Sequence, residues 1–454
     1  MKPLLAFACV SFVGGAACGG NPPVRPPVPV AFQSPLSPVA SDVPDGPSWQ
    51  DAGAEAASSP MTDASSTDAA APRAPHTGAS FDVAATKRAA TASNRMGFDV
   101  YPRLPDADKN AVFSPPSMAI ALAMAASGAR GETLAEMRRV LHSDAWPDTD
   151  SAFAALSAFM NAADGRERLV FHAENRLWGQ RGVVFNDDFV SQMTADYGAP
   201  AEDVDFRNDP IAACKAIDAW ASGATHGRVP HLFDRCPMGP LVLTTAVYFK
   251  GKWQVPFEVK ETSDLEFHTL RGEKIRVPTM RQNTSAYYAH VDGVKVLELP
   301  YRGGLSMLVA VPDDPKHLAE IERHLGARSD SWRAALASDP WDVDVYLPKW
   351  TANPKYSLGK PLSALGMRLA FGNHADFSGI QTALPLAIDD VGQFTFIAVD
   401  EEGTEAAAVT GLSIVETSLS VRRAEFRADR PFIYLIEDRT SGAVLFVGRV
   451  VDPR

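Results

Sequence analysis

The chain has 454 residues, of which 46% are hydrophobic and 22% are charged, as in an ordinary soluble globular protein. Its formal net charge is -12 and it has no long basic stripe, so we expect no nucleic-acid partner, because phosphate binding needs a basic face.

Residues 1–18 have the pattern of a signal peptide: Lys2, an apolar run from Leu4 to Val13, and small residues up to Cys18. The sequence GGAAC at 14–18 resembles a lipoprotein signal, in which Cys18 is lipidated and becomes the new N-terminus. It departs from that pattern at Gly15, where Leu is usual, so lipidation and plain secretion stay open as alternatives. Both place the protein outside the cell or on its envelope, with membrane contact only through the lipid.

Residues 19–80 consist mainly of Pro, Ala, Ser, Asp and Gly. Such a segment buries too little apolar surface to offset the entropy of ordering, so we predict a disordered tether. A leader without further function is the alternative. From residue 81 to residue 454 the composition is globular and has no second linker, which predicts one large domain.

Helical periodicity appears first in the globular part, at 85–103 and 115–141, and a polar helix is expected from Asp209 to about Gly227. Apolar strand-like runs follow. They lie at 241–250, 295–299, 305–311, 343–347, 394–399, 432–437 and 443–450. Helices crowd the first half and strands the second, which predicts an α+β fold.

The sequence has no GxSxG nucleophile motif, no phosphate-binding loop, no HExxH and no paired-cysteine metal set. We therefore predict no enzyme activity, no cofactor and no metal site. Cys214 and Cys236 lie in the globular part, where they form either a disulfide or two separate buried thiols.

Four segments, in order, resemble the serpin family of serine protease inhibitors. They are 110–133 (NAVFSPPSMAIALAMAASGARGET), 241–257 (LVLTTAVYFKGKWQVPF), 375–380 (ADFSGI), and 396–410 with 427–453. The resemblance implies a bacterial secreted or lipoprotein serpin, with about nine helices around three β-sheets and an exposed reactive-centre loop. It also implies a monomer that inhibits serine endopeptidases as a suicide substrate, through a covalent acyl-enzyme complex.

The segment 401–426 is long for a connection between strands, and irregular loops of this length are usually functional or disordered. From Thr404 onward, one face of the alternating pattern is uncharged and becomes more apolar, which suits the underside of a buried strand. Gly403 can act as the pivot. The resemblance makes this the hinge of the loop, formed by Gly403, Thr404, Glu405, Ala406, Ala407, Ala408 and Val409.

The scissile bond of the family lies fourteen residues after the hinge glycine, which gives Thr417-Ser418. The stretch 418–432 aligns with the family without gaps and gives the same bond. Glu416 and Leu419 are the next choices. A Thr before the bond suits an elastase-like or subtilisin-like protease, whereas Glu416 would suit a glutamate-specific one.

The resemblance also implies two control clusters. At the top of the central sheet, Glu401 and Lys349 correspond to a pair near Trp253, for which an ordinary surface ion pair is the alternative. Beneath the sheet, the family hydrogen-bonds an Asn and a His near Ser114 and Ser117. Thr245 and Gln393 stand at those two positions here, which puts the details of that network in doubt.

Two further functions stay open at this point. One is a non-inhibitory serpin that binds or carries another molecule, and the other is inhibition of papain-like cysteine proteases. The small hinge residues Ala406, Ala407, Ala408 and Val409 favour inhibition.

Overall fold

The structure is a computed structural model of the chain. It describes residues 82–162, 170–199, 201–228, 231–233, 236–381, 385–404 and 422–454. The predicted signal peptide, the lipidation site Cys18 and the predicted tether all lie outside these residues.

Nine α-helices lie within the described residues, as the resemblance implies. They are α1 (Val83–Val100), α2 (Pro115–Gly128), α3 (Gly131–Val140), α4 (Thr149–Asn161), α5 (Asp187–Gln192), α6 (Pro210–Ala224), α7 (Leu318–Arg323), α8 (Leu325–Leu336) and α9 (Gly359–Ala364).

The helix expected at 115–141 is in fact two helices. Arg130 is extended and Gly131 has a φ of +54°, a conformation that favours glycine, so the chain turns between α2 and α3. Helix α2 begins with Pro115 at its first position and is buried on nearly every side. Its Ala- and Met-rich sequence, apolar all round, is typical of a helix enclosed by other elements.

The predicted strands are all present, although several are longer than expected. In chain order the strands are β1 (Ala111–Phe113), β2 (Val170–Gln180), β3 (Ala201–Val204), β4 (Leu241–Lys252), β5 (Ser263–His268), β6 (Lys274–Val291), β7 (Val294–Pro300), β8 (Leu305–Pro312), β9 (Trp341–Pro348), β10 (Trp350–Ala352), β11 (Lys355–Ser357), β12 (Ile388–Asp400), β13 (Gly403–Thr404), β14 (Arg423–Arg427), β15 (Phe432–Asp438) and β16 (Val444–Val450).

These strands form two hydrogen-bonded sheets rather than three separate ones. The nine-stranded sheet has the order β1-β16-β15-β8-β7-β6-β9-β14, with β5 beside β6. The long strand β6 joins its two parts, because residues 279–286 pair with β9 and residues 287–291 pair with β7. Two of the three expected sheets are therefore continuous through β6.

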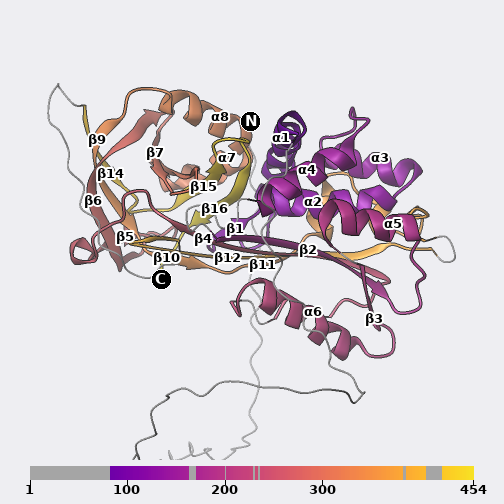
Figure 1. Ribbon diagram of the computed structural model, residues 1–454. Coiled ribbons are helices and arrows are strands. Elements are labelled where there is room, and N and C mark those ends of the chain that lie inside the picture. The colour runs from indigo at the N-terminus through magenta and orange to yellow at the C-terminus, as the bar shows by residue number, and fades with distance from the viewer. Residues whose placement is uncertain are drawn as a thin grey trace, which may run out of the picture. The chain divides into compact units, whose positions relative to one another are not determined.

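The seven-stranded sheet has the order β10-β12-β13-β4-β2-β3, with β11 beside β12. Helices α1 to α5 lie on one side of it, and α6 lies on the other (Figure 1). We call the side that carries α6 the outer face.

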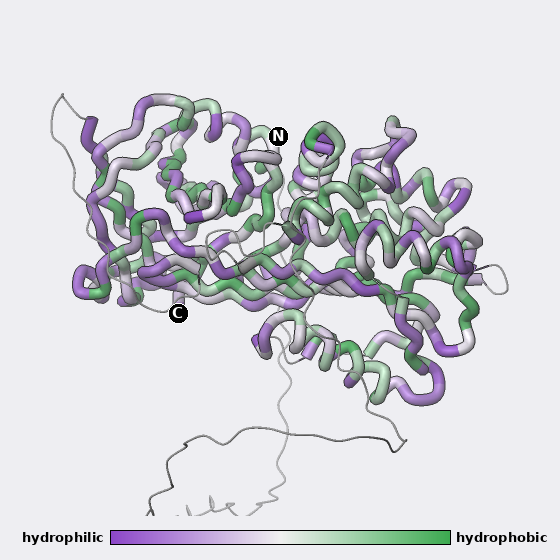
Figure 2. The backbone as a smooth tube through the Cα atoms, viewed as in Figure 1, coloured by the Kyte–Doolittle hydropathy of each residue, from purple (hydrophilic) through white to green (hydrophobic). Residues whose placement is uncertain are grey.

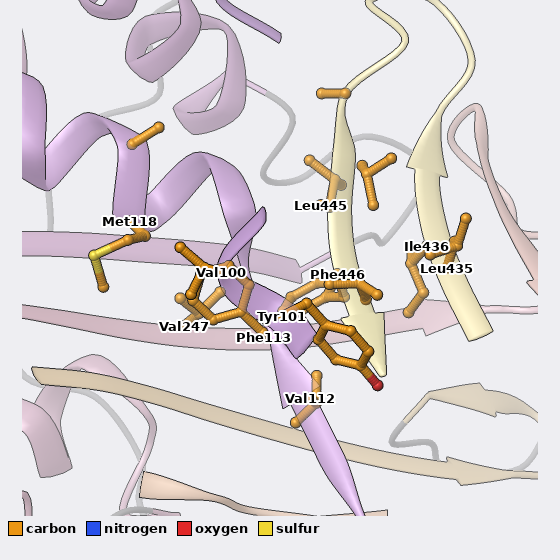
Figure 3. Packing of buried hydrophobic residues seen from close by; sticks show 14 of the residues in the cluster. Val100, Tyr101, Val112, Phe113, Met118, Val247, Leu435, Ile436, Leu445 and Phe446 are labelled. Atoms are coloured by element: carbon orange, nitrogen blue, oxygen red, sulfur yellow. The ribbon is translucent and has the colours of Figure 1, made fainter. Parts of the chain in front are cut away.

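The core fills the space between the inner face of this sheet, the helices and the nine-stranded sheet. Phe113, Met118, Val247 and Phe446 come from four different elements and pack together there (Figure 3). The most hydrophobic residues follow the central strands and the helices that face them (Figure 2). The α+β fold class predicted from the sequence is thus confirmed.

Candidate functional site at the base of the long loop

The loop begins where two central strands separate. Strands β4 and β12 run parallel and are hydrogen-bonded from the pair Leu241–Ile388 to the pair Tyr248–Phe396. We call this boundary the seam. Immediately above it, β13 enters between the two strands and pairs antiparallel with both of them: Thr404 lies opposite Gly251 on β4 and opposite Val399 on β12. The first residues of the loop are therefore already part of the sheet.

Gly403 allows this entry because of its backbone and its lack of a side chain. Its φ is +150°, and a Cβ atom there would lie 2.0 Å from the carbonyl oxygen of Gly251. Any other residue would clash with strand β4, so only glycine permits the chain to reverse from β12 into the gap.

Thr404 is fully buried and points into the core. Its Oγ1 lies 2.9 Å from the hydroxyl oxygen of Tyr301. The Tyr301 ring stacks on the Trp253 indole, with centroids 4.3 Å apart and planes 11° from parallel. The indole Nε1 in turn donates to the carbonyl oxygen of Asp400, at 3.0 Å. Burial raises the pKa of Tyr301 well above its ordinary value, so the phenol stays neutral at this contact.

Glu401 and Lys349 form an ion pair at the top of the sheet, with 2.7 Å between Nζ and Oε2. The other carboxylate oxygen of Glu401 accepts from Thr262 Oγ1 at 2.8 Å. Burial acts to raise the pKa of Glu401, but the hydrogen bonds from Lys349, the backbone and Thr262 and the charge of Lys349 hold it below its ordinary value. The carboxylate is 8% exposed, so the pair is more enclosed than an ordinary surface ion pair.

A second polar cluster lies beneath the seam, among fully buried residues. The Gln393 side chain accepts from the Ser114 backbone N–H at 2.8 Å and donates to the Ser114 carbonyl at 2.9 Å. Ser114 Oγ donates to Ser117 Oγ at 3.0 Å. Gln393, which replaces the usual His, therefore still joins the sheet to the start of α2.

Thr245 does not join this network. It lies directly opposite Gln393 across the seam, but its Oγ1 is buried without a hydrogen-bond partner. On the neighbouring strands, Asn175 Oδ1 and Thr395 Oγ1 are also buried without a hydrogen-bond partner. A buried polar group without a partner costs about 1–3 kcal/mol, so the seam region of this form is not at its most stable.

Aromatic side chains bridge the seam on the outer face. The rings of Tyr248 and Phe396 stack across it, with centroids 6.4 Å apart. His226, in the turn after α6, meets Tyr248 edge-on, and its ring also meets His172 on β2. The Arg228 guanidinium lies 5.2 Å from the centre of the Phe396 ring. The turn after α6 thus contacts both strands of the seam.

Cys214 and Cys236, for which the sequence left two alternatives, form a disulfide with 5.8 Å between their Cα atoms. It joins α6 to the segment that leads into β4. Sequence reasoning singled out neither Tyr301 nor Asn175, because both lie in ordinary strand patterns whose contacts come from distant parts of the chain.

The remaining predicted site residues lie outside the described residues. They are Glu405, Ala406, Ala407, Ala408, Val409, Glu416, Thr417, Ser418 and Leu419. Within the described ranges, no three His, Cys, Asp or Glu side chains gather as metal ligands, and no helix is both long and apolar enough to cross a bilayer.

Comparison with known proteins gives a consistent result. Residues 91–453 match the family model described as Serpin (serine protease inhibitor). The leukocyte elastase inhibitor of Bos taurus is 36% identical over 375 residues, covering 80% of this chain and 98% of the relative. A serpin-like protein of Thermococcus kodakarensis is 36% identical over 377 residues, covering 81% of this chain and 86% of the relative.

Two solved structures have the same fold. Serpin48 of the insect Tenebrio molitor superimposes with a TM-score of 0.71 and 31% identity, covering 81% of this chain and 98% of that one. Human thyroxine-binding globulin, solved in complex with its ligand, gives a TM-score of 0.74 at 25% identity, covering 81% and 99%. The relatives named here are archaeal and animal proteins.

Proposed function

The chain belongs to the serpin family, and we propose that it inhibits serine endopeptidases as a suicide substrate whose cleaved loop enters the central sheet. The observation that carries the proposal is the position of β13. Gly403 and Thr404 already pair with both β4 and β12, so the sheet holds the first two residues of an added strand. Cleavage farther along the loop would free the following residues to extend it.

The register of β13 gives the positions that the following residues would take. Each further loop residue moves one step down β4 and one step down β12. Ala407 would then lie between Tyr248 and Phe396, and Thr410 between Thr245 and Gln393. A small residue at the stacked rings and a hydroxyl at the polar cluster both suit those places.

The same register supports the direction of the change. Thr404 points into the core, so Thr410, six residues later on the strand, would point there too. Its hydroxyl would arrive beside Thr245, where polar atoms lack partners. Each new backbone hydrogen bond adds about 0.5–1.5 kcal/mol, and burying Leu412 and Ile414 adds about 1.5–3 kcal/mol each. Insertion would therefore be favourable once the loop is cut.

We assign the reactive bond to Thr417-Ser418 and the target to an elastase-like or subtilisin-like protease. A relative named leukocyte elastase inhibitor supports this class of target. A protease specific for glutamate would instead cut after Glu416. The resemblance to thyroxine-binding globulin keeps a binding or carrier role as the second candidate.

A denaturing gel distinguishes these functions. The uncut protein is mixed with pancreatic elastase, with subtilisin and, separately, with papain. A band that joins the whole protease to this chain supports inhibition, and the protease that gives it shows the class. Complete cleavage of the loop without such a band would contradict inhibition and favour the carrier role.

We further propose that the protein is a secreted bacterial monomer, anchored by lipid if Cys18 is modified. Metabolic labelling with a fatty acid tests this directly: the wild type should carry label and Cys18→Ala should not. Absence of label from both proteins, with the protein in the medium, would favour plain secretion. Size-exclusion chromatography tests the monomer.

A further inference from the structure

The disulfide lies on the outer face, over the region that an added strand would enter. Cys214 is in the first half of α6, and Cys236 lies shortly before β4 begins at Leu241. We call residues 225–240 the linker, of which 225–228, 231–233 and 236–240 are described. Figure 1 shows α6 beneath the sheet, on the side away from helices α1 to α5.

Helix α6 and the linker pack on both strands of the seam. Val242 of β4 and Phe394 of β12 belong to the same buried cluster, together with Leu232 of the linker and Ile217 of α6. This cluster is separate from the main core. This cluster bridges the seam on the outer face, whereas Gln393 lies at the seam on the inner face.

The linker is connected to β4 by the chain but rests on β12. Phe233 lies so close to Gly392 that a Cβ atom there would be 2.8 Å from its ring. The Met238 backbone N–H donates to Asp389 Oδ2 at 3.0 Å. On the helix side, the Leu232 N–H donates to Asp218 Oδ1 at 2.7 Å. The linker therefore contacts both strands that insertion must separate.

An added strand would move β4 and β12 apart by about 4.8 Å, the spacing of neighbouring strands. The contacts of Leu232 and Phe233 with β12 must break before that movement is complete. With the disulfide closed, Cys236 cannot move away from Cys214, so the linker can leave the seam only together with α6.

We propose that the Cys214–Cys236 disulfide is a redox-sensitive clamp that slows strand entry at the seam. The proposal rests on the function proposed above and adds its regulation. Reduction would let the linker leave while α6 stays in place, so fewer contacts would break at once. The closed form would hold the uncut protein in its metastable state, and the open form would insert the loop faster.

The reduction is an ordinary thiol–disulfide exchange with a dithiol. One dithiol thiolate attacks a sulfur of the bond and forms a mixed disulfide, and the second dithiol sulfur then closes its own disulfide. Two electrons and two protons pass to Cys214 and Cys236, which become thiols. Both cysteines are half-buried, and Cys236 lines a cavity of about 920 Å³, so a small dithiol can reach the bond.

The test measures strand entry without any protease. A fluorescent peptide with the sequence of residues 405–416 is incubated with the full uncut protein, and its incorporation is followed on native gels. The samples are the oxidised wild type, the wild type reduced with dithiothreitol, and Cys214→Ala/Cys236→Ala. We expect incorporation to be roughly three- to tenfold faster in the last two, which corresponds to a barrier lower by about 1 kcal/mol.

Two controls isolate the disulfide. The double variant lacks both cysteines of the disulfide, so dithiothreitol should not change its rate. Leu232→Ala, with the disulfide closed, should also speed entry because it weakens the same cluster. If the double variant does not fold, the reduced wild type still gives the comparison.

The outcomes separate the clamp from the proposed function. Faster entry in both open forms supports the clamp. Equal rates in the open and closed forms overturn the clamp and leave the inhibitor proposal standing. No entry into any form overturns the proposed function itself, and the clamp with it.

Discussion

The hydroxyl oxygens of Thr404 and Tyr301 lie 2.9 Å apart, and neither residue is exposed to solvent beyond 3%. This contact holds the second residue of β13 in the core. It also connects the loop to Trp253, which stacks on the same tyrosine.

Tyr301→Phe should lower the melting temperature of the uncut protein. The variant leaves the Thr404 hydroxyl buried without its partner, which costs about 1–3 kcal/mol. Thr404→Val combined with Tyr301→Phe removes both partners and should regain most of the loss. Thermal unfolding by circular dichroism measures it, and a double variant less stable than Tyr301→Phe would contradict the assignment.

Thr404→Arg should convert the inhibitor into a substrate. The side chain at this position points into the core, so an unpaired charge would exclude Gly403 and Thr404 from the sheet and prevent the residues after them from inserting. Thr404→Ser retains the hydroxyl and is the matched control. On a denaturing gel with elastase, the Arg variant should show only cleaved chain, whereas the Ser variant should keep the covalent band. Equal amounts of complex from both variants would count against insertion at this site.

Thr245→Val should stabilise the uncut form. It replaces a buried hydroxyl that has no partner with a methyl group of similar size. The gain in melting temperature on loop cleavage should shrink, because the cleaved form loses a contact with Thr410. Thr244→Val is the control: its hydroxyl accepts from Trp178 Nε1 at 2.9 Å, so that variant should be less stable. The reverse order of stability would refute the argument.

Lys349→Met should destabilise the uncut protein at pH 7 but much less in acid. The pKa of Glu401 is lowered in the folded state. Its pairing with Lys349 therefore adds stability at pH values above 4.5, the ordinary pKa of a glutamate. That contribution is lost as the pH falls through the lowered folded pKa. The difference in melting temperature between wild type and variant should therefore shrink between pH 7 and about pH 3.5.

Burial raises the pKa of Asp400 next to this pair, and the charge of Lys349 partly opposes that shift. Lys349→Met should therefore raise the Asp400 pKa further, which adds to the destabilisation at pH 7, where Asp400 is ionised, and not in acid. Lys260→Met is the control, because Lys260 pairs with Glu258 in solvent and such a pair contributes little. A Lys349→Met effect that does not depend on pH would show that the ion pair is not its cause.

Thr417→Arg should redirect the inhibitor toward trypsin-like proteases. The wild type cut by elastase should end at Thr417, which mass spectrometry of the released C-terminal peptide shows directly. The variant should form a covalent complex with trypsin and lose the one with elastase. A wild-type cut after Arg422 or Arg423 would contradict the assignment of both bond and target class.

Local sequence pattern was enough to predict seven of the sixteen strands and the segments that hold four of the nine helices in the described residues. A short apolar run is a property of neighbouring residues, so it predicts a buried strand such as β12 without knowledge of its partners. Local pattern predicted one helix where α2 and α3 are two, because the break at Gly131 gives only a weak signal. The order of four matching segments indicated the family before any contact was known.

Contacts between distant residues could be decided only by the tertiary structure. Thr404 meets Tyr301, Gln393 meets Ser114, and Cys214 bonds to Cys236 because the fold brings separate segments together. The tertiary structure also decided that Gly403 and Thr404 enter between two strands and that the Thr245 hydroxyl beneath them has no hydrogen-bond partner. A side chain's own sequence neighbours determine which face it occupies, but the packing of the whole domain determines what it meets there.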